Sequence, residues 1–143
     1  MSSGVRHRSR LAAGLLALFA GFSGAHRRYL GASWWPVYPL VALPAIGLAL
    51  RSDPWYRHWG FFVAALVVVV AMAEAIAFSL CPDEQWDTRH NPGHEGRAPS
   101  GWLHAPAGWP HVFVAIAALL GGAILLISVM ALALETWFLP PGP

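Results

Sequence analysis

The chain has 143 residues, enough for one domain, and 57% of them are hydrophobic while only 11% are charged. Soluble domains carry about 25% charged residues, so this composition excludes an ordinary polar shell and favours an integral membrane protein. The formal net charge is +2, and all nine cationic residues are scattered arginines. That pattern excludes the concentrated basic face of a nucleic-acid-binding protein.

The first half of the chain contains two imperfect apolar runs. A helix needs about 20 apolar residues to cross the hydrocarbon of a bilayer. After a basic tail over residues 1–10, the run from Leu11 to Ala25 falls short of that length. The run from Tyr29 to Leu50 is long enough but contains three prolines, which predict a late helix start near Trp35 or a bend.

The second half contains two clearer runs, separated by a polar loop over residues 81–110. The run from Gly60 to Leu80 carries a single charge, and an additional C-terminal helix is predicted over residues 111–139. The sequence therefore predicts an all-α polytopic membrane protein with about four transmembrane helices, the first short and the second proline-bent. The distribution of arginines predicts that both termini are cytoplasmic.

Residues 21–31, Gly-Phe-Ser-Gly-Ala-His-Arg-Arg-Tyr-Leu-Gly, form the most informative segment. Glycines at both ends permit a tight helix exit and a return. The cationic residues between them have two interpretations: they anchor the chain at the membrane interface, or they hold a lipid phosphate or a partner's carboxylate. The candidate residues of this turn are Gly21, Gly24, His26, Arg27, Tyr29 and Gly31, and its cationic or titratable side chains are His26, Arg27 and Arg28.

This segment resembles the signature of the TM-two (two-transmembrane) domain family, usually Gly-Gly-x-Gly-x-His-Arg-Phe-Tyr-Leu-Gly. Arg28 stands where the family has an aromatic residue. The resemblance implies a TM-two-like helical membrane domain over residues 11–80, in a bacterial inner-membrane protein. The biochemical activity of such proteins is mostly unassigned, and the helix over 111–139 is an addition to the domain.

Glu74 is an intramembrane carboxylate in an otherwise apolar run. A charge at the centre of a membrane helix costs about 2.5–3.5 kcal/mol on insertion scales, so this side chain needs a partner. One interpretation is a structural hydrogen bond or an arginine pair. The other is a small proton-linked transporter, because desolvation favours protonation of an isolated carboxylate.

Small residues recur every four positions in the first run, at Ala13, Ala17, Gly21 and Ala25, and in the last run as the pairs Ala117–Gly121 and Ala118–Gly122. This spacing places them on one helical face, where neighbouring backbones can approach closely. We expect helix packing through these faces. They are available either to another helix of the same chain or to a protein partner or a second copy.

The sequence predicts no catalytic residue, metal site or cofactor. His90 and His94 have the i, i+4 spacing of metal ligands, but Asn91-Pro-Gly lies between them and prevents a common helix. The sequence therefore predicts a non-enzymatic membrane module that lies in the lipid bilayer and acts through helix packing or contact with a protein partner. The alternatives are the transporter centred on Glu74 and a membrane metalloenzyme that uses the 81–111 loop.

Overall fold

Every regular element in the described part of the chain is helical. The computed structural model describes residues 7–93 and 101–139. Short 3-10 turns lie between the longer helices: η1 (Gly21–Ser23), η2 (Trp55–Arg57) and η3 (Trp102–His104). The α-helices are α1 (Arg10–Ala20), α2 (Ala25–Tyr29), α3 (Val37–Leu50), α4 (Trp59–Leu80), α5 (Asp83–His90) and α6 (Trp109–Phe138). The prediction of an all-α fold is confirmed.

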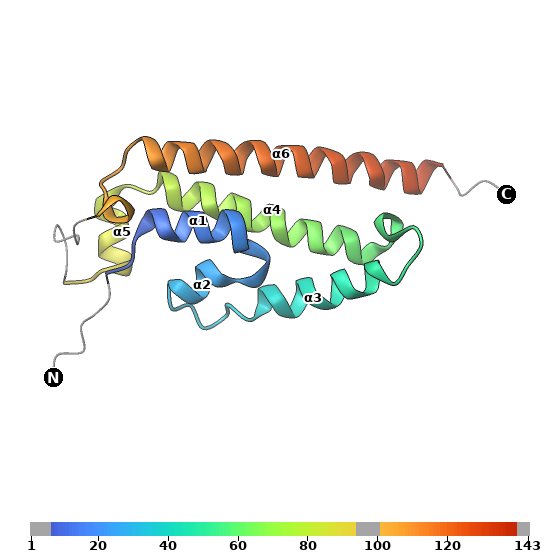
Figure 1. Cartoon of the computed structure of the whole chain (residues 1–143), viewed down its shortest axis with the longest axis horizontal. Coiled ribbons are helices and arrows are strands. Elements are labelled where there is room, and N and C mark those ends of the chain that lie inside the picture. The colour runs from blue at the N-terminus through green and yellow to red at the C-terminus, as the bar shows by residue number, and fades with distance from the viewer. Residues whose placement is uncertain (1–6, 94–100, 140–143) are drawn as a thin grey trace.

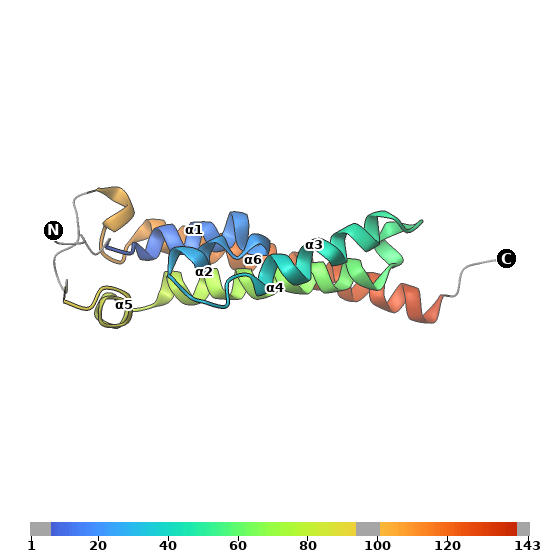
Figure 2. The same cartoon turned by 90° about the horizontal axis from the view of Figure 1, so that it is seen from below.

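Two helices of the described chain, α4 and α6, are long and apolar enough to cross a membrane. They have 22 and 30 residues, so they are about 33 Å and 45 Å long. They lie side by side (Figures 1 and 2). A core helix of a soluble protein is mostly buried, but only 17% of the most apolar window of each helix is buried. Such broad apolar faces suit contact with lipid.

The helices of the first two apolar runs are much shorter. α1 has 11 residues and α3 has 14, which correspond to about 16 Å and 21 Å. The two helices follow one another along α4, with α1 on the C-terminal half and α3 on the N-terminal half (Figure 1). Neither is long enough to cross a membrane alone. The four spanning helices predicted from the sequence are therefore not shown, because the turn after α1 and the proline before α3 divide this layer into two half-length helices.

The turn after α1 depends on glycine. Gly24 has a φ of 69°, and a Cβ atom built on it would lie 2.4 Å from the carbonyl oxygen of Trp35. Gly31, at the return of the chain, has a φ of 75°. Other residues rarely adopt this left-handed conformation, so glycine at these two positions lets α2 fold back along α1 and the chain then reverse again into α3.

Alanine and glycine bring the backbones of three helices together. Ala17 of α1, Ala75 of α4 and Ala118 of α6 form a buried cluster. Gly21 lies against Ala71, with 2.2 Å between a Cβ built on the glycine and the Cβ of the alanine. The small-residue faces of α1 and α6 thus pack on α4 within a single chain, while Ala25 and Ala117 lie outside this buried cluster.

Polar contacts mark the two ends of the bundle. At the C-terminal end of α4, here called the cap end, Arg10 pairs with Asp83 at 2.8 Å. At the N-terminal end of α4, here called the link end, an Arg57 nitrogen donates to the carbonyl oxygen of Leu139 at 2.9 Å. The start of α1 and the end of α6 therefore lie at opposite ends of α4 (Figure 1). In the described residues α1 and α3 together make one passage along α4 rather than two, and the prediction that both termini are cytoplasmic stays a prediction.

Replacement of Gly21 by alanine tests the close contact between α1 and α4. We expect Gly21→Ala to lower the free energy of unfolding by about 1–3 kcal/mol, because the added methyl group overlaps Ala71 and forces the helices apart. Thermal unfolding of the purified protein in detergent micelles measures this loss.

Gly47→Ala in α3 is the matched control, since a Cβ at Gly47 meets nothing within 4 Å. It should be neutral or stabilise the helix by about 0.5–1 kcal/mol, the usual gain over glycine. Equal melting temperatures for the two variants would show that α1 and α4 are not in this contact.

Candidate functional site

The carboxylate of Glu74 is the centre of a cluster of four polar side chains. Glu74 lies six residues before the end of α4, about 9 Å from the cap end, and its side chain is 15% exposed. Its Oε2 atom lies 2.5 Å from Nε2 of His26 and accepts a hydrogen bond of 2.6 Å from the hydroxyl of Tyr38. Its Oε1 atom accepts a hydrogen bond from Nη2 of Arg27. We call His26, Arg27, Tyr38 and Glu74 the Glu74 cluster.

Three different elements supply this cluster. His26 and Arg27 are consecutive residues of α2, which the glycine turn folds back toward α4. Tyr38 is in the first turn of α3, and Glu74 is in α4. The Glu74 cluster therefore joins the folded-back segment and the start of α3 to a long helix, at the place where α1 has ended and α3 begins.

Aromatic rings surround the charges of the Glu74 cluster. The guanidinium carbon of Arg27 lies 4.1 Å from the centroid of the Trp34 ring and 5.7 Å from that of Phe78. The ring of His26 is fully buried and packs edge-on against Tyr38, with 5.1 Å between ring centroids. Cation–π contacts of this kind are strongest where water is excluded, so the rings stabilise the arginine beside its carboxylate partner.

The chemistry of the Glu74 cluster is that of a closed ion pair. An ionised carboxylate only accepts hydrogen bonds, so the hydrogen between it and His26 belongs to Nε2 in this arrangement. Three donors then occupy both oxygens of Glu74, and the charge of Arg27 balances the carboxylate. An isolated charge in so apolar a helix is costly, and the pairing with Arg27 offsets that cost.

The other residues of the glycine-bounded segment serve the same folded-back shape. The backbone N–H of Ser9 donates to the Tyr29 hydroxyl oxygen at 2.7 Å, which ties the end of α2 to the chain just before α1. Gly31 lies against the guanidinium of Arg8, which a Cβ at this position would meet at 2.6 Å. Arg28 is exposed and lies over the ring of Trp35, at 5.3 Å from its centroid.

Sequence reasoning singled out three of the four residues of the Glu74 cluster and missed Tyr38. The signal was present, because Tyr38 places a hydroxyl in an apolar, proline-rich run, where a buried tyrosine O–H usually finds a partner. It was also not evident that Arg27 binds a carboxylate of its own chain, 47 residues further on.

A second polar cluster, the polar cap, closes the cap end. The side chain of Asn91 is fully buried, accepts from the backbone N–H of Arg8 at 2.7 Å and donates to Asp87 at 2.8 Å. The indole N–H of Trp86 donates to the carbonyl oxygen of Arg8 at 2.8 Å. Burial is the main cause that lowers the pKa of His90, whose ring stacks on Trp86. A cavity of about 240 Å³ lies within the cap, lined by His7, Ser9, Arg10, Asp83, Asp87 and His104.

The histidines and acids of the 81–111 loop do not form a metal site within residues 7–93 and 101–139. No group of three or more His, Cys, Asp or Glu side chains there is arranged to hold a metal ion. His90 stacks on Trp86, and His111 is buried in the first turn of α6. His94 lies outside the described residues.

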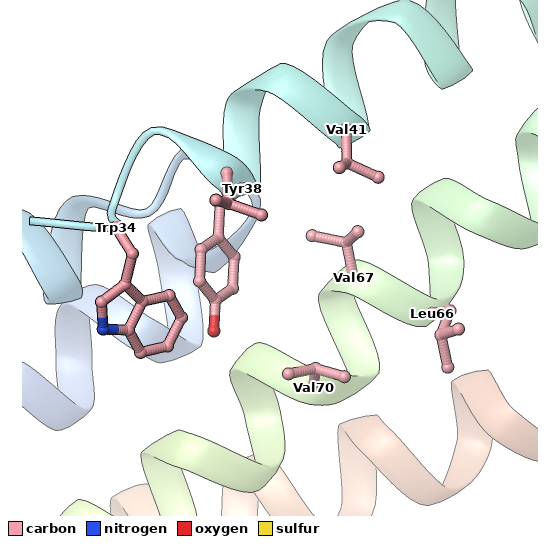
Figure 3. Close-up of a pocket in the computed structure, with 7 residues that line it drawn as sticks. Trp34, Tyr38, Val41, Leu66, Val67 and Val70 are labelled. Atoms are coloured by element: carbon pink, nitrogen blue, oxygen red, sulfur yellow. The ribbon is translucent and has the colours of Figure 1, made fainter.

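An apolar groove adjoins the Glu74 cluster. It lies between α3 and α4, has a volume of about 270 Å³ and is lined by Trp34, Val37, Tyr38, Val41, Leu66, Val67 and Val70. Figure 3 shows the rings of Trp34 and Tyr38 side by side at one end of this groove and Leu66 at the other. Two residues that line the groove also contact the charges of the Glu74 cluster: Tyr38 donates to Glu74, and Trp34 packs on Arg27.

The fold and the Glu74 cluster together define a structural class. The chain is an all-helical protein with two helices that could cross a membrane and an internally satisfied carboxylate beside an apolar groove. Comparisons with known protein families, with curated proteins and with solved structures find no match to this chain.

Removal of the carboxylate tests what the Glu74 cluster contributes to stability. We expect Glu74→Ala to lower the free energy of unfolding by about 3 kcal/mol, because the buried His26 and the partly buried Arg27 lose their acceptor. The loss is measured by unfolding in detergent micelles.

Glu135→Ala in α6 serves as the control, since Glu135 is exposed. It should change the free energy of unfolding by less than about 0.5 kcal/mol. A Glu74→Ala protein as stable as the Glu135→Ala protein would contradict a structural role for the cluster.

Proposed function

We propose that this chain is a non-enzymatic, multi-pass membrane module of the TM-two type that acts by presenting helix faces to lipid and to a protein partner. The observation that supports this most is the distribution of polarity. The carboxylate of Glu74 is satisfied internally, while α3, α4 and α6 expose apolar side chains along their length. A carboxylate whose hydrogen bonds are all made within the chain, beneath apolar outer helix faces, suits helix packing rather than turnover of a substrate.

Aromatic residues at both ends support a membrane setting. Apart from Trp34 at the groove between α3 and α4, the exposed tryptophans of the described residues lie near the link end, at Trp55, Trp59 and Trp137, and near the cap end, at Trp102 and Trp109. Tryptophan prefers the interface between hydrocarbon and water, so the two groups mark the two surfaces of a bilayer. On this proposal α4 and α6 each cross once, and α1 and α3 share a third crossing.

The distribution of arginines supports an orientation. Arg8, Arg10 and Arg89 lie at the cap end, and Arg28 lies in the segment that folds back toward it. Only Arg51 and Arg57 of the described residues lie at the link end. Cytoplasmic segments carry more arginine, so we place the cap end and the N-terminus in the cytoplasm of a bacterial cell and the link end outside.

The two alternatives have weaker support. A proton-linked transporter needs Glu74 to exchange its proton with water, but three donors of this chain occupy its oxygens. A metalloenzyme needs ligands gathered in the 81–111 loop, and the described part of that loop does not gather them. We therefore rank both below the packing module.

Reporter fusions test the proposed crossings. We expect a reporter before Met1 and one after Pro143 to report opposite sides of the membrane, because the start of α1 and the end of α6 lie at opposite ends of α4. Paired alkaline phosphatase and green fluorescent protein fusions measure sidedness. The same side for both ends would contradict a three-crossing arrangement and restore the four-helix one.

Site-specific photo-crosslinking tests the partner function. A photoreactive residue at Ile127, which is 67% exposed on α6, or at Leu43, which is 57% exposed on α3, should yield a discrete protein adduct in native membranes. The same photoreactive residue placed at position 55, where Trp55 is exposed at the link end, serves as the comparison. Adducts with lipid alone from both apolar faces would contradict a partner-binding module, whereas a single reproducible protein band would support it.

A further inference from the structure

The groove between α3 and α4 has a direction. Its aromatic end is formed by Trp34 and Tyr38, and its aliphatic end by Val41 and Leu66 (Figure 3). α3 runs from the Glu74 cluster toward the link end, so the aromatic end faces the cap side of the bundle (Figure 1). The groove therefore begins beside the Glu74 cluster and continues along α4 toward the link end.

Positive charge lies beside the aromatic end of the groove. Arg27 packs on Trp34, and Arg28 lies over the neighbouring Trp35. The carboxylate of Glu74 neutralises Arg27. Arg28 is exposed and forms no ion pair with the described residues. Arg28 is thus left uncompensated on α2, over the residue that follows the groove residue Trp34 in the chain.

We propose that this groove is a binding site for an anionic phospholipid, with one acyl chain along the groove and the phosphate at Arg28. The lining residues carry two polar groups, the indole N–H of Trp34 and the Tyr38 hydroxyl, which is already bonded to Glu74, and the rest of the lining is apolar, so the groove suits a hydrocarbon chain. A cation at one end and hydrocarbon walls beyond it match a lipid whose head group lies toward the cap. This inference goes beyond the packing function and shares with it only the membrane setting.

The dimensions of the groove favour an acyl chain over a partner helix. The groove has a volume of about 270 Å³ and lies between two helices of this chain. An α-helix with its side chains is about 10–12 Å wide, which is wider than a furrow between two packed helices. A single extended hydrocarbon chain is narrow enough to lie between Val41 on one wall and Val70 on the other.

Native mass spectrometry of the purified full chain tests the head-group contact. The protein in detergent micelles is titrated with phosphatidylglycerol and with phosphatidylcholine of the same acyl chains, and bound lipids are counted. We expect the wild type to retain phosphatidylglycerol preferentially. Arg28→Gln should lower that preference about fivefold, the effect of one arginine on an anionic lipid surface. Arg51→Gln, which changes an exposed arginine at the link end, should leave it unchanged.

A second pair of variants tests the groove itself. Val70→Trp places an indole in the groove from a position that is 43% exposed, and it should reduce retention of both phospholipids. Ile127→Trp, at an exposed position of α6 outside the groove, is the matched control and should bind as the wild type does. Circular dichroism confirms that each variant is folded.

Two results would overturn the proposal. One is a folded Val70→Trp protein that retains phosphatidylglycerol as well as the Ile127→Trp protein does. The other is a lipid preference that is the same in the Arg28→Gln and Arg51→Gln proteins. Neither result bears on photo-crosslinking from α6, so failure of the lipid site and failure of the partner-binding function remain distinguishable.

Discussion

The carboxylate of Glu74 is the constraint on which the arrangement of the first half of the chain depends. A charge in an apolar helix needs a partner, and α4 contains no cation to provide one. The partner is Arg27, from a segment that must fold back to reach it. His26 and Tyr38 complete the set of donors, so α2 and the start of α3 are both held against α4.

This constraint explains why two apolar runs give one passage along α4. α1 ends at Ala20, opposite the middle of α4, because the glycine turn follows and leads into the donors of Glu74. α3 then starts near the same depth and continues to the link end. The discontinuity leaves polar backbone groups part-way along α4; on the proposed membrane arrangement these groups lie within the bilayer, where non-helical backbone is tolerated if protein buries it. The same discontinuity forms the aromatic end of the groove between α3 and α4.

Much of the helical content could be predicted from the sequence. α4 and α6 follow from run length and apolarity, and the glycine turn follows from Gly21 and Gly24, whose φ value or close contacts require glycine. The need of Glu74 for a partner follows from desolvation. The identity of that partner does not, because several arginines are available and only the three-dimensional fold selects Arg27. The number of passages was also out of reach, since a run of apolar residues gives its length but not the point at which its helix starts.

The central claim is that Arg27 and Glu74 stabilise the protein through each other. A double-mutant cycle with Arg27→Met, Glu74→Leu and the combined variant measures this directly as unfolding free energies in detergent micelles. The account predicts that each single change is strongly destabilising and that the double change costs less than their sum by about 2 kcal/mol. Additive effects, with a coupling energy near zero, would contradict it.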